Sequence, residues 1–257
     1  MKINLKPKIA FFDFTGCEGC QLTAIDSLQA NLDLLEAVEI VQFREAMSER
    51  DENYQIAFVE GSYTRTPDET RLQAIRQRAK IVVALGSCAH LGGVNTLRNT
   101  QSLENVGRYV YGNMWKMFES DSARPVSAVI QIDAYIPGCP IDRDEFVRSV
   151  KALLQGRKPA IPDYAVCVEC KLKEIGCVVL QGKTCLGAIT RAGCGAICPA
   201  FRFGCEGCRG LVSNPNLNWL KTAHVEFGLN KEELAGKLKL FMSYQMMESD
   251  QYGNGKR

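Results

Sequence analysis

Residues 8–20 read KIAFFDFTGCEGC, and this stretch indicates the fold of the chain. Lys8–Phe14 is a short apolar and aromatic run that predicts a buried strand, and Thr15-Gly16 after it predicts a turn. From residue 19 to residue 35, apolar side chains recur at helical spacing. The chain therefore begins with a strand, a tight turn that carries two cysteines, and a helix.

The same alternation continues through residue 156. Further strands are predicted at residues 38–43, 55–59, 80–85 and 126–132. One helix is predicted to start with Thr66 as its N-cap, and another is predicted to run from Asp142 to Gly156. Strands that alternate with helices imply parallel pairing, so we expect an α/β fold with a doubly wound parallel sheet.

The composition excludes several classes of function. The 257 residues carry 31 basic and 29 acidic side chains, a net charge of +2, whereas nucleic-acid-binding proteins usually show a basic excess or a basic stripe. No apolar run approaches the roughly 18 residues that a membrane-spanning helix needs. The N-terminal residues show no export signal. We therefore expect a cytoplasmic protein with no nucleic-acid partner and no membrane span.

Composition also divides the chain into three expected parts. Residues 1–156 form the α/β domain, and a stiff linker, GRKPAIP, follows it. Residues 157–212 form a small, irregular, cysteine-rich domain. Residues 213–257 carry a C-terminal helix, predicted from about Asn230 to Met247, and then a polar tail that we expect to be disordered.

Cysteine is the unusual component, with 12 residues in a chain too long to need disulfide bonds. In a reducing compartment this number favours metal ligation or redox chemistry. Four cysteines follow predicted strands: Cys17, Cys20, Cys88 and Cys139. Because the carboxyl ends of parallel strands meet at one edge of a sheet, these thiolates would gather there and suit zinc or an iron–sulfur cluster. The alternative is that Cys88 and Cys139 are small buried side chains.

The other eight cysteines lie close together in the sequence: Cys167, Cys170, Cys177, Cys185, Cys194, Cys198, Cys205 and Cys208. Eight thiolates divide into two sites of four, and the glycine-rich segment around them needs ligand bonds to fold. Two zinc ribbons are one interpretation, and two iron–sulfur clusters are the other. The local partition places the first four in one site and the last four in the other, but Cys177 and Cys194 could change places.

The sequence contains no convincing catalytic pair and no phosphate-binding loop. Glu18, between Cys17 and Cys20, would either carry protons or hydrogen-bond the loop. An aromatic patch is predicted to serve packing or an interface rather than a cofactor; it comprises Tyr109, Tyr111, Trp115 and Phe118. The chain is thus suited to hold redox centres but shows no site for a substrate.

Five segments together resemble the small subunit of nickel–iron hydrogenases. They are TGCEGCQLTAIDS (15–27), VEGS (59–62), ALGSCAHLGG (84–93), IPGCPID (136–142) and the cysteine-rich segment at 167–210. The likeness covers roughly residues 8–210 in order and spacing. It is nearest to the cytoplasmic, bidirectional branch, which includes sulfhydrogenase delta subunits and the small subunits of methyl-viologen- and deazaflavin-reducing hydrogenases.

The resemblance implies a flavodoxin-like first domain in which Cys17, Cys20, Cys88 and Cys139 ligate a proximal 4Fe–4S cluster. It implies that the eight later cysteines hold a medial and a distal 4Fe–4S cluster. Electrons would pass between a nickel–iron centre on a large-subunit partner and an NAD(P)- or ferredoxin-linked partner. Flavin- or NAD(P)-binding and iron–sulfur diaphorase subunits are the further partners expected, and no residue of this chain would ligate the nickel–iron centre.

Comparison with two related groups, the periplasmic hydrogenases and respiratory complex I, refines the resemblance. Cys167 stands where periplasmic members have a histidine among the distal ligands, and all-thiolate ligation generally lowers the reduction potential. The homologous subunit of respiratory complex I has adjacent cysteines, unlike Cys17-Glu18-Gly19-Cys20, and lacks the cysteine-rich segment. A zinc-stabilised interaction module and a complex-I-like electron carrier are the alternative functions, and the sequence does not name the final electron acceptor.

Overall fold

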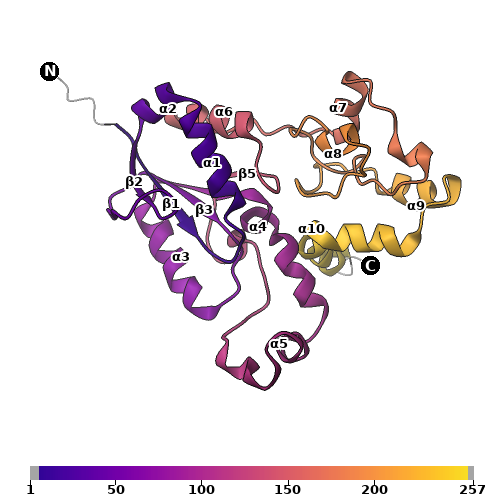
Figure 1. The fold of residues 1–257 in the computed structure, drawn as a ribbon, viewed down its shortest axis with the longest axis horizontal. Coiled ribbons are helices and arrows are strands. Elements are labelled where there is room, and N and C mark those ends of the chain that lie inside the picture. Colours follow the sequence, from indigo (N-terminus) through magenta and orange to yellow (C-terminus); the bar gives the residue numbers. More distant parts are fainter. Residues whose placement is uncertain (1–5, 254–257) are drawn as a thin grey trace. The chain divides into compact units, whose positions relative to one another are not determined.

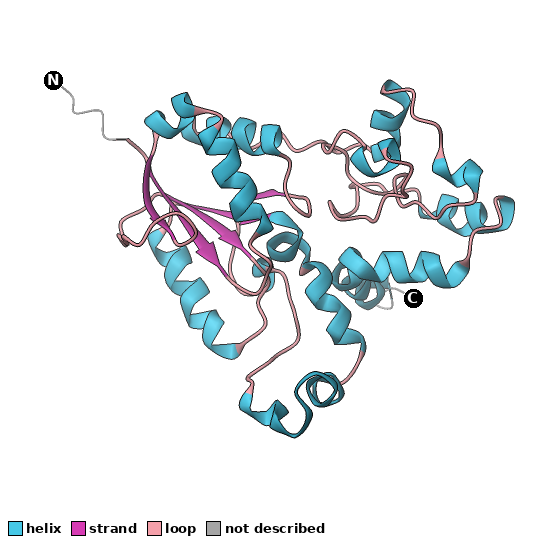
Figure 2. Cartoon of the chain, in the orientation of Figure 1, coloured by secondary structure: helices cyan, strands magenta, loops and turns pink. Residues whose placement is uncertain are grey.

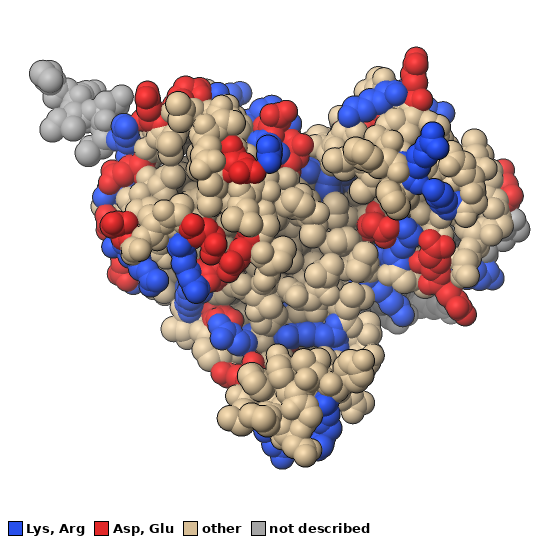
Figure 3. Space-filling view, in the orientation of Figure 1, with Lys and Arg blue, Asp and Glu red and all other residues tan. Residues whose placement is uncertain are grey.

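The computed structural model describes residues 6–253 and divides into two compact units, Met1–Ala160 and Ile161–Arg257 (Figure 1). The first unit contains all the strands of the sheet. The second contains the eight clustered cysteines and the C-terminal helices. Basic and acidic side chains are interspersed on the face shown in Figure 3, in agreement with the near-neutral net charge.

The first unit is built on a five-stranded parallel sheet with strand order β2-β1-β3-β4-β5. Figure 2 draws the strands in magenta. They are β1 (Lys8–Asp13), β2 (Glu39–Phe43), β3 (Ile56–Glu60), β4 (Ile81–Leu85) and β5 (Ala134–Ile136). This order is that of flavodoxin-like folds, in which the winding direction reverses between β1 and β3. The predicted doubly wound α/β fold is confirmed.

Within residues 6–160, six α-helices and three 3₁₀ helices accompany the strands, and the last of them, α6, follows β5. They are α1 (Gly19–Gln29), α2 (Leu32–Ala37), α3 (Thr66–Arg78), α4 (Gly86–Leu91), η1 (Gly93–Thr100), α5 (Leu103–Tyr111), η2 (Gly112–Met117), η3 (Val126–Ala128) and α6 (Arg143–Leu154). Helix α6 begins as predicted, because the Asp142 side chain accepts a hydrogen bond from the Glu145 N–H at 2.8 Å.

The strand predicted at residues 126–132 is wrong. Val126–Ala128 forms the 3₁₀ helix η3, and the edge strand is β5, a few residues later. Val126 and Ile130 are nevertheless buried in the core. A short apolar run does not distinguish a strand from a buried helical turn, and here the run packs against the sheet instead of pairing with it.

Two helix predictions also need correction. The helical pattern at residues 19–35 is two helices, α1 and α2, because the chain turns at Ala30-Asn31. Thr66 is the first residue of α3 and does not cap it; the N-cap is Arg65, which makes no capping hydrogen bond. Instead, the Arg65 guanidinium donates two hydrogen bonds to the Asp68 carboxylate, at 3.0 and 2.8 Å.

The core lies on both faces of the sheet. On one face, Phe11 stacks on Phe58 with ring centroids 4.9 Å apart, and both contact Phe146 of α6. On the other face, Ala10 and Phe12 of the same strand pack toward α3. Successive side chains of a strand point to opposite faces, so the continuous apolar run of β1 fits a strand that is buried on both sides.

The second unit has little regular structure around its cysteines. Its elements are α7 (Val166–Leu172), η4 (Val178–Gln181), α8 (Ile197–Ala200), α9 (Leu217–Glu226) and α10 (Lys231–Gly253). A small core joins Val178 and Val179 to Ala223 and Leu229, so the cysteine-rich segment and the C-terminal helices share one unit. Among residues 6–253, no helix is both long enough and apolar enough to cross a membrane.

Helix α10 corrects the expected tail. It begins after Asn230, as predicted, where the side-chain oxygen accepts from the N–H groups of Glu232 and Glu233. It continues to Gly253, so residues 248–253 are helical and the expectation of disorder is wrong for them. Residues 254–257 lie outside the described part of the chain.

We predict that Phe146→Ala lowers the free energy of unfolding by about 3–5 kcal/mol, because it leaves a cavity between α6 and two aromatic rings of the sheet. Phe118→Ala is the matched control in the same unit, since that ring is 48% exposed; its loss should be about 1 kcal/mol. Chemical denaturation measures both, and equal losses would contradict the assignment of Phe146 to the core.

Candidate metal centres

The carboxyl edge of the sheet carries the four dispersed cysteines. Cys17 and Cys20 follow β1, Cys88 lies in α4 directly after β4, and Cys139 follows β5. Burial raises the pKa of Cys88 to about 12, and the negative charges of Cys139, Cys17 and Glu60 contribute to this rise. Three loops that are distant in sequence therefore bring the thiols of these cysteines within electrostatic range of one another.

Backbone contacts join the loops that carry these thiols. The Ser87 N–H donates to the Gly138 carbonyl at 2.8 Å, which links the end of β4 to the end of β5. Gly86 has φ +79, and a Cβ atom there would lie 2.3 Å from Cys20 Sγ. Only glycine suits this position, because any side chain would both strain the backbone and displace a thiol.

Glu60, the last residue of β3, lies buried beside the thiols with 3% of its surface exposed. Its carboxylate accepts hydrogen bonds from the backbone N–H groups of Cys20 at 3.1 Å and Gln21 at 3.0 Å. Burial raises the pKa of Glu60, and these two hydrogen bonds oppose the rise. The motifs in the sequence gave Glu60 no role. The feature of the sequence that could have indicated a role for Glu60 is an acidic residue at the end of an otherwise apolar strand, IAFVE.

Glu18 is the N-cap residue of α1 and has a left-handed backbone with φ 62. Burial raises the pKa of its carboxyl, and the neighbouring charge of Glu45 raises it further. The proton or hydrogen-bonding role of Glu18 stays a prediction.

In the second unit, four cysteines line one pocket of about 230 Å³: Cys167, Cys170, Cys177 and Cys185. The remaining walls are mainly apolar and include Val179 and Trp219. A Cβ atom on Gly187 would lie 3.4 Å from Cys185 Sγ and 3.7 Å from Cys167 Sγ. Cys185 Sγ accepts from the Cys205 N–H at 3.2 Å, and such hydrogen bonds stabilise a thiolate. Four thiols around one largely apolar pocket, with a backbone donor to one of them, suit an iron–sulfur cluster.

The other four cysteines of the second unit are Cys194, Cys198, Cys205 and Cys208. Burial raises the pKa of Cys198, and the charge of Cys194 adds to the rise. Burial likewise raises the pKa of Cys205, with a smaller contribution from Cys208. Arg209, which is almost completely buried, opposes the rise in the pKa of Cys194. Cys185 of the first set contributes more to the rise in the pKa of Cys205 than Cys208 does, and the Cys205 N–H donates to Cys185 Sγ at 3.2 Å, so the two sets of cysteines lie close together.

Among residues 6–253, no three or more His, Cys, Asp or Glu side chains are spaced to hold a single metal ion. Each thiolate of a 4Fe–4S cluster binds a different iron, so its ligands need not meet the spacing of ligands around one ion. Thiols whose pKa values burial has raised ionise when they bind a cationic metal centre. The donor sets and their surroundings therefore fit clusters of this kind.

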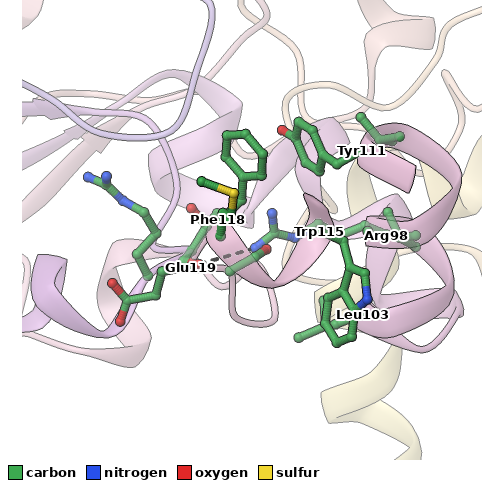
Figure 4. A pocket seen from close by; sticks show the side chains of 13 residues that line it. Arg98, Leu103, Tyr111, Trp115, Phe118 and Glu119 are labelled. Atoms are coloured by element: carbon green, nitrogen blue, oxygen red, sulfur yellow. Dashed lines mark hydrogen bonds between the residues drawn. The ribbon is translucent and has the colours of Figure 1, made fainter. Parts of the chain in front are cut away.

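The predicted aromatic patch lies on α5, η2 and the residue after them. It is exposed: 92% of Tyr109 and 48% of Phe118 are accessible. Beside it is a pocket of about 490 Å³, in which Tyr111 stacks on Phe118 and Trp115 and Arg98 contribute to the walls (Figure 4). Exposed apolar surface of this kind is typical of interaction sites, which favours an interface over packing.

Comparison with known proteins identifies the family. Residues 17–153 match the family described as NADH ubiquinone oxidoreductase, 20 Kd subunit. The chain is 36% identical to sulfhydrogenase 2 subunit delta of Pyrococcus furiosus, over 91% of this chain and 98% of that protein. It is 27% identical to a chain of the crystal structure of an NAD⁺-reducing [NiFe]-hydrogenase, with a TM-score of 0.54, over 61% of this chain and 96% of that one. The chain belongs to the nickel–iron hydrogenase small-subunit family.

Another relative is a subunit of the F420-non-reducing hydrogenase vhu of Methanococcus voltae. It is 32% identical over 80% of this chain and 82% of that protein. The resemblance drawn from the five sequence segments is thus confirmed, and so is the assignment to hydrogenase subunits, which are oxidoreductases.

We predict that Gly86→Ala destabilises the protein more than Gly156→Ala does. Both glycines have positive φ, at +79 and +70, so both variants carry a backbone strain of about 1 kcal/mol. Only at Gly86 does the new Cβ meet another atom, Cys20 Sγ, whereas Gly156 faces open space. This overlap adds about 1–3 kcal/mol. Chemical denaturation compares the two, and equal free energies of unfolding would show that the thiol is free to move aside.

Proposed function

We propose that this chain is the electron-transfer subunit of a cytoplasmic, bidirectional nickel–iron hydrogenase and holds three 4Fe–4S clusters. One observation carries the proposal: the twelve cysteines form groups of thiols, one group at the carboxyl edge of the sheet and the others in the second unit. Four thiolates for each of three clusters account for all twelve. A bound 4Fe–4S cluster accepts and donates single electrons, which is the chemistry this subunit needs.

The proximal cluster would be held by Cys17, Cys20, Cys88 and Cys139. The chain's own residues shape this site by ordinary contacts. Glu60 holds the start of α1 through the N–H groups of Cys20 and Gln21, and Gly86 lets α4 begin against Cys20. The two hydrogen bonds to Glu60 hold the backbone at Cys20 and Gln21, so this part of the site needs less ordering when a cluster is assembled.

The eight later cysteines would hold the medial and distal clusters in the local partition. The pocket shared by Cys167, Cys170, Cys177 and Cys185 supports this choice, because Cys177 faces the same cavity as the C-x-x-C pair. The second set would be Cys194, Cys198, Cys205 and Cys208. All-thiolate ligation favours low reduction potentials, which suits an NAD(P)- or ferredoxin-linked acceptor.

The partner that carries the nickel–iron centre is a hydrogenase large subunit. Members of the family are subunits of hydrogenases, including a sulfhydrogenase, and the exposed aromatic patch around Tyr109 and Phe118 offers a surface for a protein partner. Flavin- or NAD(P)-binding and iron–sulfur diaphorase subunits would complete the assembly. The cytoplasmic location and these diaphorase partners stay predictions.

Metal analysis of the chain, purified without oxygen together with its large subunit, tests the proposal. We expect about twelve iron and twelve acid-labile sulfide per chain, four of each for every set of four thiolates. About eight iron would contradict the third cluster. Two or three zinc with little sulfide would mean that the thiols are structural, and the electron-transfer function would then be wrong.

Two cysteine variants test the order of electron flow. Cys139→Ser should abolish hydrogen-dependent reduction of both a dye and the natural acceptor, because the proximal cluster is the first to receive electrons. Cys208→Ser should reduce transfer to the natural acceptor at least tenfold, while dye reduction falls less, because dyes still draw electrons from the proximal cluster. Equal losses in both assays for Cys208→Ser would contradict this order.

A further inference from the structure

Helix α7 holds the loop that carries Cys194. Glu169 lies on α7 between Cys167 and Cys170, and its carboxylate accepts from the backbone N–H groups of Gly193 at 2.8 Å and Ala196 at 3.0 Å. At the end of the same helix, the Lys173 ammonium donates to the Gly195 carbonyl at 2.7 Å. One acidic and one basic side chain, four residues apart, thus bind three backbone groups of the loop.

The loop needs such support because its backbone is unusual. Ala196 has φ 54, a left-handed conformation that is unfavourable for a residue with a side chain, and it is fully buried at the start of α8. The hydrogen bond from its N–H to Glu169 stabilises this conformation. Cys194 and Cys198 lie on either side of the strained residue, so the position of both thiols depends on it.

The Glu169 carboxylate also lies close to two groups of thiols. Its Oε2 atom is 3.9 Å from Cys194 Sγ. Cys170, the residue after Glu169 on the same helix, is near enough that the charges of both Glu169 and Cys194 contribute to the rise in its pKa, after burial and the other nearby thiols. The carboxylate therefore stands between the two sets of four thiols proposed above.

We propose that Glu169 is a positioning residue that joins the ligand helix of one cluster to the Cys194 loop of the next, and that its negative charge lowers the reduction potential of the cluster bound through Cys194. The inference rests on the proposed function. Reduction adds an electron to a cluster, so a nearby negative charge favours the oxidised form, and the effect is strong in a partly buried setting. The positive charge of the buried Arg209 and nearby solvent weaken the effect of the Glu169 charge on the potential. Both are the same in the wild type and in a Glu169 variant, so they do not change the direction of the shift between the two.

The direction in which the reduction potential of the cluster shifts distinguishes an effect of the Glu169 charge from an effect of a loosened Cys194 loop. Glu169→Gln has nearly the same shape and removes the charge, so the potential of the affected cluster should rise. Lys173→Gln loosens the same loop but removes a positive charge, so the potential should stay the same or fall. Glu174→Gln is the matched control, since Glu174 is an exposed acidic residue of the same segment. If looseness alone mattered, Glu169→Gln and Lys173→Gln would shift the potential in the same direction.

The experiment is a redox titration followed by electron paramagnetic resonance, on the complex with its large subunit, with iron and sulfide measured on every sample. A rise in one cluster potential for Glu169→Gln, with no rise for the Lys173 and Glu174 variants, supports the proposal. An unchanged potential with full iron overturns it. Wild-type protein without clusters would instead refute the proposed function.

If Glu169→Gln loses iron and its potential cannot be measured, a second variant, Glu169→Asp, tests the proposal. Glu169→Asp keeps the charge but withdraws it from Cys194, so a sample that keeps its iron should show a smaller rise in the same potential. Full iron with an unchanged potential in this variant overturns the electrostatic part of the proposal. Loss of iron in Glu169→Asp, with full iron in the Glu174 control, supports the positioning part, since only the geometry has then changed.

Discussion

Parallel pairing of the strands is the constraint on which the first unit depends. Because β1, β3, β4 and β5 run in the same direction, the segments after them emerge at one edge, and the four dispersed cysteines lie in those segments. The same pairing places Glu60 at the end of β3, where its carboxylate reaches the N–H groups that begin α1. A buried carboxylate with two such bonds is stable only because the strand end and the helix start are held together.

The second unit follows a different principle. Its hydrophobic cores are small, and one of them includes Cys185 and Cys205 among its buried members. Side chains that hydrogen-bond the backbone replace part of the missing apolar packing: Glu169 and Lys173 hold one loop, and Arg209 donates to the Ala192 carbonyl at 2.8 Å. Burial of polar groups of this kind stabilises a fold when their hydrogen bonds are made. In the proposed function, metal–thiolate bonds supply the rest.

Each of the two units places a carboxylate beside thiols. Glu60 lies near Cys20 and Cys88, and Glu169 near Cys170 and Cys194. Each accepts backbone N–H bonds, so each carboxylate has a structural role and also sets a negative charge at a fixed place. A charge held in this way is better defined than one on an exposed side chain, because solvent screens it less.

Patterns among neighbouring residues in the sequence predict several elements of this structure. The apolar run of β1 and the Asp142 cap each determine structure through neighbouring residues, so the sheet class and the start of helix α6 were predicted correctly, whereas the division of the cysteines into clusters stays a prediction. The edge strand was misplaced because Val126–Ile132 and Ala134–Ile136 are both short apolar runs, and only pairing with β4 decides between them. The roles of Glu60 and Glu169 needed the tertiary structure, since their partners lie 24 to 40 residues away. Sequence alone determines which side chains are present and how nearby ones repeat, whereas contacts between distant segments depend on which of several similar packings has the lowest free energy.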